Sequence, residues 1–285
     1  MNEELEARLY HFLTLAEETL IRTLPLLPPV VAWEEGKAYL WQKVGNAGHF
    51  LPVAHVDDIG LDDLIGIEQQ KNILYTNTLQ FVQGLPANHA LLWGAHGTGK
   101  SSLVKALLNT FYSEGLRLVE VARDDLADLP WIATALSKHP QKFIVFCDDL
   151  SFTENESGYR ALKVALDGSI AARENNVLVY ATSNRRHLLP ESAKDREDIF
   201  QKDAFEEKIA LADRFGLWLA FYGFEIDAYE KAVLHWLDHF HVPQSYWEQA
   251  KQEALAWSRQ RGLSGRAASQ FARDFAGRLA IRATR

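Results

Sequence analysis

Apolar residues along this chain form two kinds of run. Four runs are continuous, at residues 90–93, 143–147, 177–181 and 217–222, and a fifth, at 116–121, is interrupted only by Arg117 and Glu120. Continuous apolar runs are typical of strands buried on both faces, as in a parallel sheet that helices cover on each side. The segments between these runs carry apolar residues at helical spacing. We therefore predict an α/β core over residues 56–226, with three layers: a parallel sheet between two layers of helices.

The pattern becomes purely helical towards the end of the chain. Beyond Asp227 no further strand is predicted, and apolar residues recur at helical spacing over 228–240, 245–260 and 264–281. This change of period predicts a separate helical domain at residues 227–285.

The first residues form a third region. Residues 3–24 have helical spacing and acidic residues in the first turn. Two short apolar runs, 38–41 and 50–53, flank the segment Gly45-Asn46-Ala47-Gly48, which is typical of a hairpin turn. We interpret residues 1–55 as an N-terminal accessory region with a helix followed by a hairpin.

A phosphate-binding pattern follows the run at 90–93. Gly94-x-x-x-x-Gly99-Lys100-Ser101 stands between a predicted strand and a predicted helix. In this pattern the glycines let backbone N–H groups surround the β-phosphate, the lysine reaches the β- and γ-phosphate oxygens, and the serine hydroxyl binds Mg²⁺. The alternative is a glycine-rich turn with no ligand. We predict a nucleoside triphosphate site made by Gly94, Ala95, His96, Gly97, Thr98, Gly99, Lys100, Ser101 and Ser102.

Two carboxylates follow the run at 143–147. Ligands of open α/β sheets bind at the carboxyl ends of the strands, which places Asp148 and Asp149 near the same nucleotide. We expect Asp148 to hold Mg²⁺ and Asp149 to activate the attacking water. The alternative for Asp149 is a cap on the following loop. Cys147 is expected to be inert, because apolar surroundings raise the pKa of a thiol.

With both motifs in this order, the chain resembles the AAA+ ATPases over roughly residues 60–280. Residues 177–184 resemble the strand that carries the γ-phosphate sensor of that family, which would be Asn184. The resemblance implies ATP and Mg²⁺ as cofactors and a homo-oligomer, most simply a ring or an open helical arc. It further implies an arginine finger at Arg214 acting on a neighbouring subunit, a lid arginine at Arg266, and an adenine-contacting segment at Ile65 and Gly66.

Three strings narrow this resemblance. Cys-Asp-Asp-Leu-Ser-Phe, Ala-Thr-Ser-Asn-Arg-Arg-His-Leu and Asp-Arg-Phe-Gly-Leu are similar to a bacterial family of predicted AAA+ ATPases that is catalogued only as a domain of unknown function. Two features depart from the AAA+ pattern. Asp149 stands where a longer glutamate is usual, which bears on water activation more than on nucleotide binding. The polar segment 151–159 is a poor match to the pore loop of threading enzymes, so threading is disfavoured.

Several side chains keep a second interpretation. Arg214 could pair at the surface with Asp213 or Glu207, which would stabilise the protein little. Arg266 could be a helix-end arginine of a basic lid. Arg185 and Arg186 could reach phosphate or an acidic subunit edge. Four tryptophans at helical positions are most simply core residues: Trp131, Trp236, Trp247 and Trp257.

The composition restricts where the protein is expected to be located and which partners it is expected to bind. The 285 residues include one cysteine, so no disulfide framework exists, and the acidic N-terminus is no secretory signal. No apolar run approaches the roughly 18 residues of a membrane helix. These features predict a cytoplasmic protein without a membrane partner. The net charge is −8, yet residues 251–285 hold eight Lys/Arg against two acidic residues, which suits a nucleic-acid surface, an acidic neighbouring subunit or a solvated helix face.

These features together predict Mg²⁺-dependent hydrolysis of ATP to ADP and phosphate. An oligomeric module would couple this reaction to a protein or nucleic-acid client. The alternative is a slow-turnover, ATP-gated switch similar to a loader or initiator, which Asp149 and the poor match to a pore loop favour. A small-molecule kinase is disfavoured, because the sensor strand, the finger and the helical lid would have no purpose in it.

Overall fold

The computed structural model describes residues 3–23, 31–44, 47–150, 157–167, 175–184 and 214–283. Two features singled out from the sequence lie outside these residues. They are the arginine pair Arg185 and Arg186, and most of the polar segment 151–159.

Seven strands of the described chain form one sheet, in the order β2-β1-β4-β5-β6-β3-β7. Every neighbouring pair is parallel except β1 with β2. The strand that precedes the phosphate loop and the strand that precedes the acid pair are separated by β6. The strands are β1 (Ala38–Val44), β2 (Ala47–Pro52), β3 (Ala90–Gly94), β4 (Leu116–Glu120), β5 (Lys142–Cys147), β6 (Val177–Ser183) and β7 (Leu217–Phe221).

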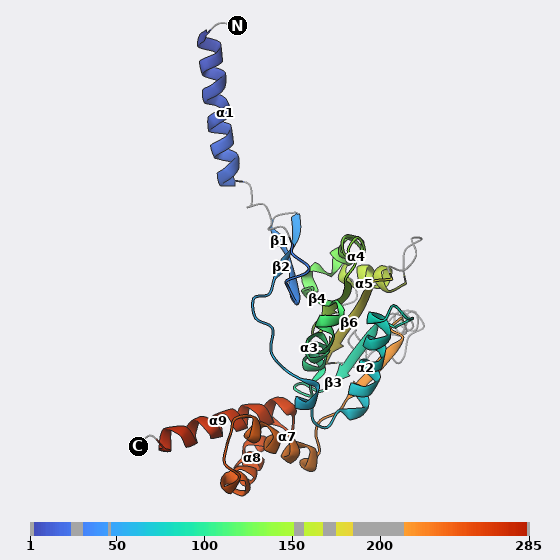
Figure 1. The fold of residues 1–285 in the computed structure, drawn as a ribbon, viewed down its shortest axis with the longest axis vertical. Coiled ribbons are helices and arrows are strands. Elements are labelled where there is room, and N and C mark those ends of the chain that lie inside the picture. The colour runs from blue at the N-terminus through green and yellow to red at the C-terminus, as the bar shows by residue number, and fades with distance from the viewer. Residues whose placement is uncertain are drawn as a thin grey trace, which may run out of the picture.

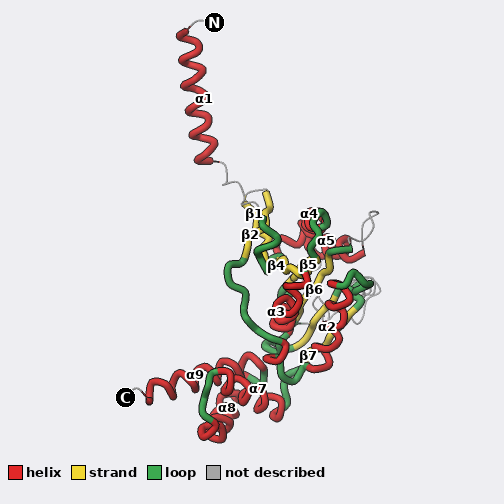
Figure 2. Tube along the Cα trace, in the orientation of Figure 1, coloured by secondary structure: helices red, strands yellow, loops and turns green. Residues whose placement is uncertain are grey.

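Helices cover both faces of this sheet, as Figures 1 and 2 show. On one face, α4 (Leu129–Leu136) and α5 (Ser157–Asp167) bury leucines against strand residues such as Val145 and Val179. On the other face, α2 (Glu68–Val82) and α3 (Lys100–Phe111) form a second core with Leu92. The predicted three-layer α/β fold with a mostly parallel sheet is confirmed.

A buried polar cluster fixes α2 on the sheet. The hydroxyl of Tyr180, on β6, lies 2.9 Å from both the Asn77 Nδ2 and the Thr78 Oγ1 of α2. The Asn77 side chain also bonds the backbone of Asn88, just before β3, through both of its polar atoms. Because these buried groups satisfy one another, the helix has a fixed position beside the strand that leads into the phosphate loop.

The helical C-terminal region is also confirmed. α7 (Ile226–His239), α8 (Trp247–Arg261) and α9 (Gly265–Ala283) pack around a third core that includes Tyr229 and Phe271. We call these three helices the lid. In Figure 1 the lid lies beside the end of the core where the short helix η1 (Leu61–Asp63) begins. No described helix has both the length and the apolar content to cross a membrane.

The hairpin differs from its predicted place in the domain plan. β1 and β2 pair as expected, but residues Ala38–Leu40 of β1 also pair in parallel with Leu118–Glu120 of β4. A boundary at residue 55 therefore cuts through the sheet, and the hairpin belongs to the core instead of an accessory region. Local patterning predicts a hairpin but cannot show which distant strand it joins.

Two further observations concern apolar side chains. Trp131, expected in the core, is 57% exposed, because Leu129, Ile132 and Leu136 form the inward side of the short helix α4. The N-terminal helix α1 (Glu3–Thr23) has the predicted bounds and lies apart from the core in Figure 1. Its apolar residues Leu5, Leu9, Tyr10, Phe12, Leu13 and Leu15 are exposed.

Candidate nucleotide-binding and active site

The loop between β3 and α3 is built on glycines with positive φ. The φ angles are 136° at Gly94, 74° at Gly97 and 99° at Gly99. At Gly94 the neighbouring strand also leaves no room, since an added Cβ would lie 1.9 Å from the Phe221 carbonyl oxygen. These positions explain why the pattern requires glycine there.

Lys100 is held at the centre of the loop. Its side chain is buried, and Nζ donates to the carbonyl oxygens of Gly94 (2.8 Å) and Ala95 (2.7 Å) and to Asn184 Oδ1 (3.1 Å). Desolvation lowers the pKa of Lys100, and Arg266 adds to this effect, whereas Asp148 and Asp149 oppose it. The Lys100 amine therefore lies within electrostatic reach of the acid pair.

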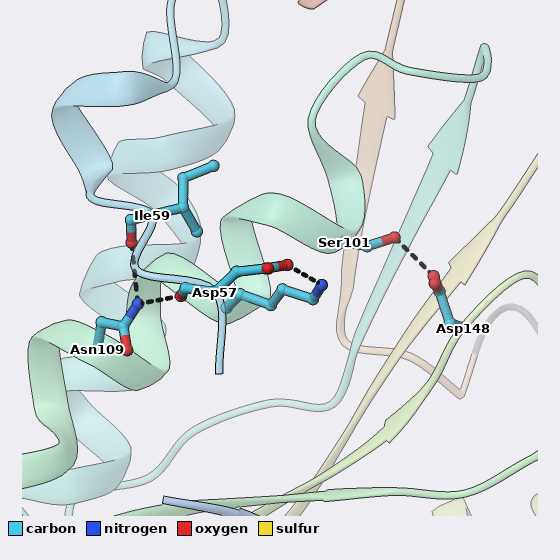
Figure 3. Close-up of polar contacts among 6 residues, drawn as sticks. Asp57, Ile59, Ser101, Asn109 and Asp148 are labelled. Atoms are coloured by element: carbon cyan, nitrogen blue, oxygen red, sulfur yellow. Dashed lines mark hydrogen bonds and ion pairs between the residues drawn. The ribbon is translucent and has the colours of Figure 1, made fainter. Parts of the chain in front are cut away.

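The first acid, Asp148, meets the loop serine. Ser101 Oγ donates to Asp148 Oδ1 at 2.6 Å, across the gap between α3 and the end of β5 (Figure 3). A hydroxyl beside a carboxylate supplies the hard oxygen donors that Mg²⁺ prefers. The two predicted metal-binding residues are thus brought together.

The second acid, Asp149, has an unusual backbone. Its φ is 53°, a left-handed conformation that costs a non-glycine residue about 1–2 kcal/mol. Its carboxylate accepts a hydrogen bond from the Asn184 side chain. Asn184 therefore contacts both Lys100 and Asp149, which joins the sensor candidate to the loop and to the acid pair.

Thr182 was not predicted as a site residue. Its hydroxyl donates to Asp148 Oδ1 at 2.5 Å and accepts from the Asp149 backbone N–H at 2.8 Å. The sequence held one signal for it: Thr182 is two positions before Asn184 on a strand, and alternate residues share a face.

A cavity of about 630 Å³ lies over these groups, within the usual size of a small-molecule site. Twelve predicted residues line it: Ile65, His96, Gly97, Thr98, Gly99, Lys100, Ser101, Ser102, Asp148, Asp149, Asn184 and Arg266. The predicted residues Gly66, Gly94, Ala95 and Arg214 are not among the lining residues. Unpredicted lining residues include Asp63, Ile67, Phe224, Trp236, Gln270 and Arg273.

The lid closes one side of this cavity. The backbone N–H of Arg266, at the start of α9, donates to the Gly97 carbonyl oxygen at 3.1 Å. His235 Nε2, on α7, lies 2.9 Å from Asp63 Oδ1 in the core. Desolvation opposes ionisation of Asp63, but the Gly60 N–H and His235 outweigh it and lower the pKa of this carboxyl. The lid is thus attached both to the phosphate loop and to η1.

The segment before η1 is fixed to α3 (Figure 3). Asn109 Nδ2 donates to the carbonyl oxygens of Asp57 (2.9 Å) and Ile59 (3.1 Å), and Lys105 Nζ lies 2.6 Å from Asp57 Oδ2. The Lys105 contact lowers the pKa of Asp57. These contacts hold residues 57–59, which we call the entry segment, against the helix that begins with Lys100. Ile65, a few residues further along the chain, lines the cavity.

Arg214 lies at the opposite end of the sheet. It lies three residues before the start of β7, and the Leu217 N–H bonds the His89 carbonyl oxygen at the amino end of β3. The phosphate loop follows the carboxyl end of the same strand. Arg214 is therefore not brought to the cavity of its own chain.

Cys147 is fully buried next to the acid pair. Desolvation raises the pKa of its thiol to about 12, with smaller contributions from Glu120 and Asp148. This raised pKa agrees with the expectation that the thiol is inert.

Comparison with known proteins gives a family and a fold. The model of a family described as "Protein of unknown function (DUF815)" matches residues 34–279. A variant of Thermotoga maritima RuvB superposes with a TM-score of 0.56 at 17% identity, over 79% of this chain and 67% of that one. The ORC1 protein of Aeropyrum pernix in complex with DNA gives 0.52 at 14%, over 80% and 63%. No curated protein matches the sequence.

Proposed function

Because this chain belongs to the family described as "Protein of unknown function (DUF815)" and has the AAA+ fold, we propose that it binds ATP between core and lid and hydrolyses it to ADP and phosphate. One observation carries the proposal. A buried lysine, a serine–carboxylate pair and a second carboxylate held by an asparagine converge on one cavity that a lid arginine also lines.

The residues present fit both ATP and Mg²⁺. The positive-φ glycines turn backbone N–H groups towards an anion, Lys100 supplies a buried ammonium, and Ser101 with Asp148 supplies oxygen donors. When bound, Mg²⁺ neutralises charge on the phosphates. Asp149 is proposed to orient the attacking water, and Asn184 to hold that carboxylate while contacting the γ-phosphate.

The adenine would contact the apolar residues that line the cavity. These are Ile65, Ile67, Phe224 and Trp236, which come from both the core and the lid. Because Arg266 is also on the lid, nucleotide binding would connect base, phosphates and lid position.

We propose that Arg214 acts in trans on the nucleotide of a neighbouring copy. Its place at the amino end of the sheet supports this proposal, because it is not among the residues that line its own cavity. An arginine finger contributes about 10³–10⁵ to turnover in comparable systems, so an assembled enzyme and an isolated one would differ widely.

A protein client is favoured over nucleic acid. Two of the eight basic residues of the C-terminal stretch are paired within the lid: Lys251 pairs with Glu248, and Arg278 pairs with Glu253 and Asp274. Fewer unpaired cations are then offered to a phosphate backbone. Steep loss of DNA binding with increasing salt would instead identify a nucleic-acid client.

The test is the ATPase rate per protomer as protein concentration rises, for wild type, Arg214→Ala and Arg259→Ala. Arg259 is an exposed arginine on α8 and serves as the matched control. We expect the rate to rise with concentration in wild type and the control and to collapse in Arg214→Ala. A concentration-independent rate that Arg214→Ala leaves unchanged would refute the finger. Tight ATP binding with almost no turnover would favour the ATP-gated switch.

A further inference from the structure

We propose that Thr182 is a positioning residue that aligns both acids of the site through one hydroxyl, an inference that rests on the proposed ATP site. The direction of its hydrogen bonds follows from counting the protons that each group can donate. The Asp149 N–H brings its own proton to Thr182 Oγ1, so the hydroxyl proton is free to go to Asp148 Oδ1. One oxygen thus connects the metal-binding acid with the backbone of the water-activating acid.

The backbone of Thr182 completes this arrangement. Its carbonyl oxygen accepts from the Leu150 N–H at 2.7 Å, so Thr182 holds the residues at both ends of the peptide unit that follows Asp149. Asp149 lies at a positive φ, which a side-chain-bearing residue keeps only when its surroundings impose it. The two contacts from Thr182 hold the backbone of Asp149 in this conformation.

The consequence for chemistry comes from the reach of the second acid. An aspartate side chain is short, so the position of its backbone decides where its carboxylate lies. The Thr182 hydroxyl fixes this backbone, and Asn184 contacts the carboxylate. On the other side, Asp148 Oδ1 accepts from both Thr182 and Ser101, so the same hydroxyl also orients the acid of the metal site.

Thr182 is well suited to an isosteric test. It is 1% exposed within β6, where valine has nearly the same shape and suits a strand. Thr182→Val deletes the hydroxyl, whereas Thr182→Ser keeps it. Thr78→Val is the matched control, because Thr78 is also buried and hydrogen-bonded but lies on α2, against Tyr180.

Two quantities are measured for each variant: kcat and KM for ATP hydrolysis, and the ratio of ATP dissociation constants without and with Mg²⁺. We expect Thr182→Val to lower kcat roughly 10- to 100-fold. We also expect it to reduce the Mg²⁺ enhancement of ATP binding about 10-fold, as removal of a group that orients a metal ligand does. Thr182→Ser should restore both quantities, and Thr78→Val should change neither.

The outcomes separate this inference from the proposed function. The role of the hydroxyl would be overturned if Thr182→Val kept the kcat and the Mg²⁺ enhancement of wild type. It would also be overturned if Thr182→Ser lost as much of both quantities as Thr182→Val. If wild type binds ATP without hydrolysing it, the hydrolysis proposal fails and the Mg²⁺ ratio alone decides on Thr182. If wild type does not bind ATP, both proposals are refuted.

Discussion

Replacing Gly94 with alanine should damage both the fold and the nucleotide site. The added Cβ would lie 1.9 Å from the Phe221 carbonyl oxygen and 2.7 Å from the Phe221 carbonyl carbon. Both are backbone atoms of β7, so no side-chain rotation can relieve the contact. β3 and β7 would have to separate where Gly94 pairs with Phe221.

The magnitude can be built from three contributions. A left-handed alanine costs about 1–2 kcal/mol. Separation of the strands would break the bond from the Ala95 N–H to the Phe221 carbonyl, at about 1–3 kcal/mol for a buried unpaired group. Displacement of the buried Phe221 side chain adds about 1–3 kcal/mol. We expect a loss of roughly 3–8 kcal/mol in the free energy of unfolding, a large share of the 5–15 kcal/mol of a typical domain.

Urea unfolding followed by circular dichroism measures this loss, and two other glycines supply the control. Gly84 and Gly115 also have positive φ, at 75° and 91°, but an added Cβ would meet nothing within 4 Å at either. Alanine there should cost only the backbone contribution, about 1–2 kcal/mol. ATP titration of Gly94→Ala should also show weaker binding, because the Gly94 and Ala95 carbonyls hold Lys100. Equal stability of Gly94→Ala and Gly84→Ala would refute the reasoning.

Three further predictions follow from single groups. Asn109→Ala should weaken ATP binding a few-fold and lower the free energy of unfolding in urea by about 1–2 kcal/mol, because the Asp57 and Ile59 carbonyls lose their donor. Unchanged values of both would show that other contacts hold the entry segment. Cys147 should react with a thiol reagent at pH 8 only after unfolding, because burial raises its pKa to about 12, and labelling of the native protein would contradict its burial. The lowered pKa of Asp63 means that its stabilising contribution is present above its unfolded pKa of about 4 and is lost as the pH falls through the lower folded pKa. Urea unfolding of wild type and Asp63→Asn should therefore differ more at pH 5 than at pH 2.5, and an equal difference at both would refute the assignment.

The sequence predicted the parts of the fold whose signals are local. Apolar runs, four of them continuous, marked the five core strands, and the change to helical spacing after Asp227 marked the lid. Trp131 was wrongly assigned to the core, because helical spacing alone does not say which face of a short helix turns inward. The parallel pairing of the hairpin with β4 was not foreseen, because no local pattern specifies a distant partner.

The candidate site divides in the same way. Lys100, Ser101, Asp148 and Asn184 were expected together, and the structure brings them together because motif spacing reflects backbone geometry at two strand ends. Thr182 was missed because a threonine in a strand reads as a packing residue until its partners are known.

The hairpin at β1 and β2 has a consequence for how the edge of the sheet is protected. Without it the sheet would end at β4, a strand whose residues Leu116, Leu118 and Val119 are all buried. An uncovered edge of that kind is a template for pairing with other chains and hence for aggregation. The hairpin moves the sheet edge to β2, a six-residue strand that contains Gly48 and ends in Pro52, which has no N–H to offer. Shortened versions made for expression should therefore begin before residue 38, since a start at residue 56 would leave the edge of β4 unpaired and prone to aggregation.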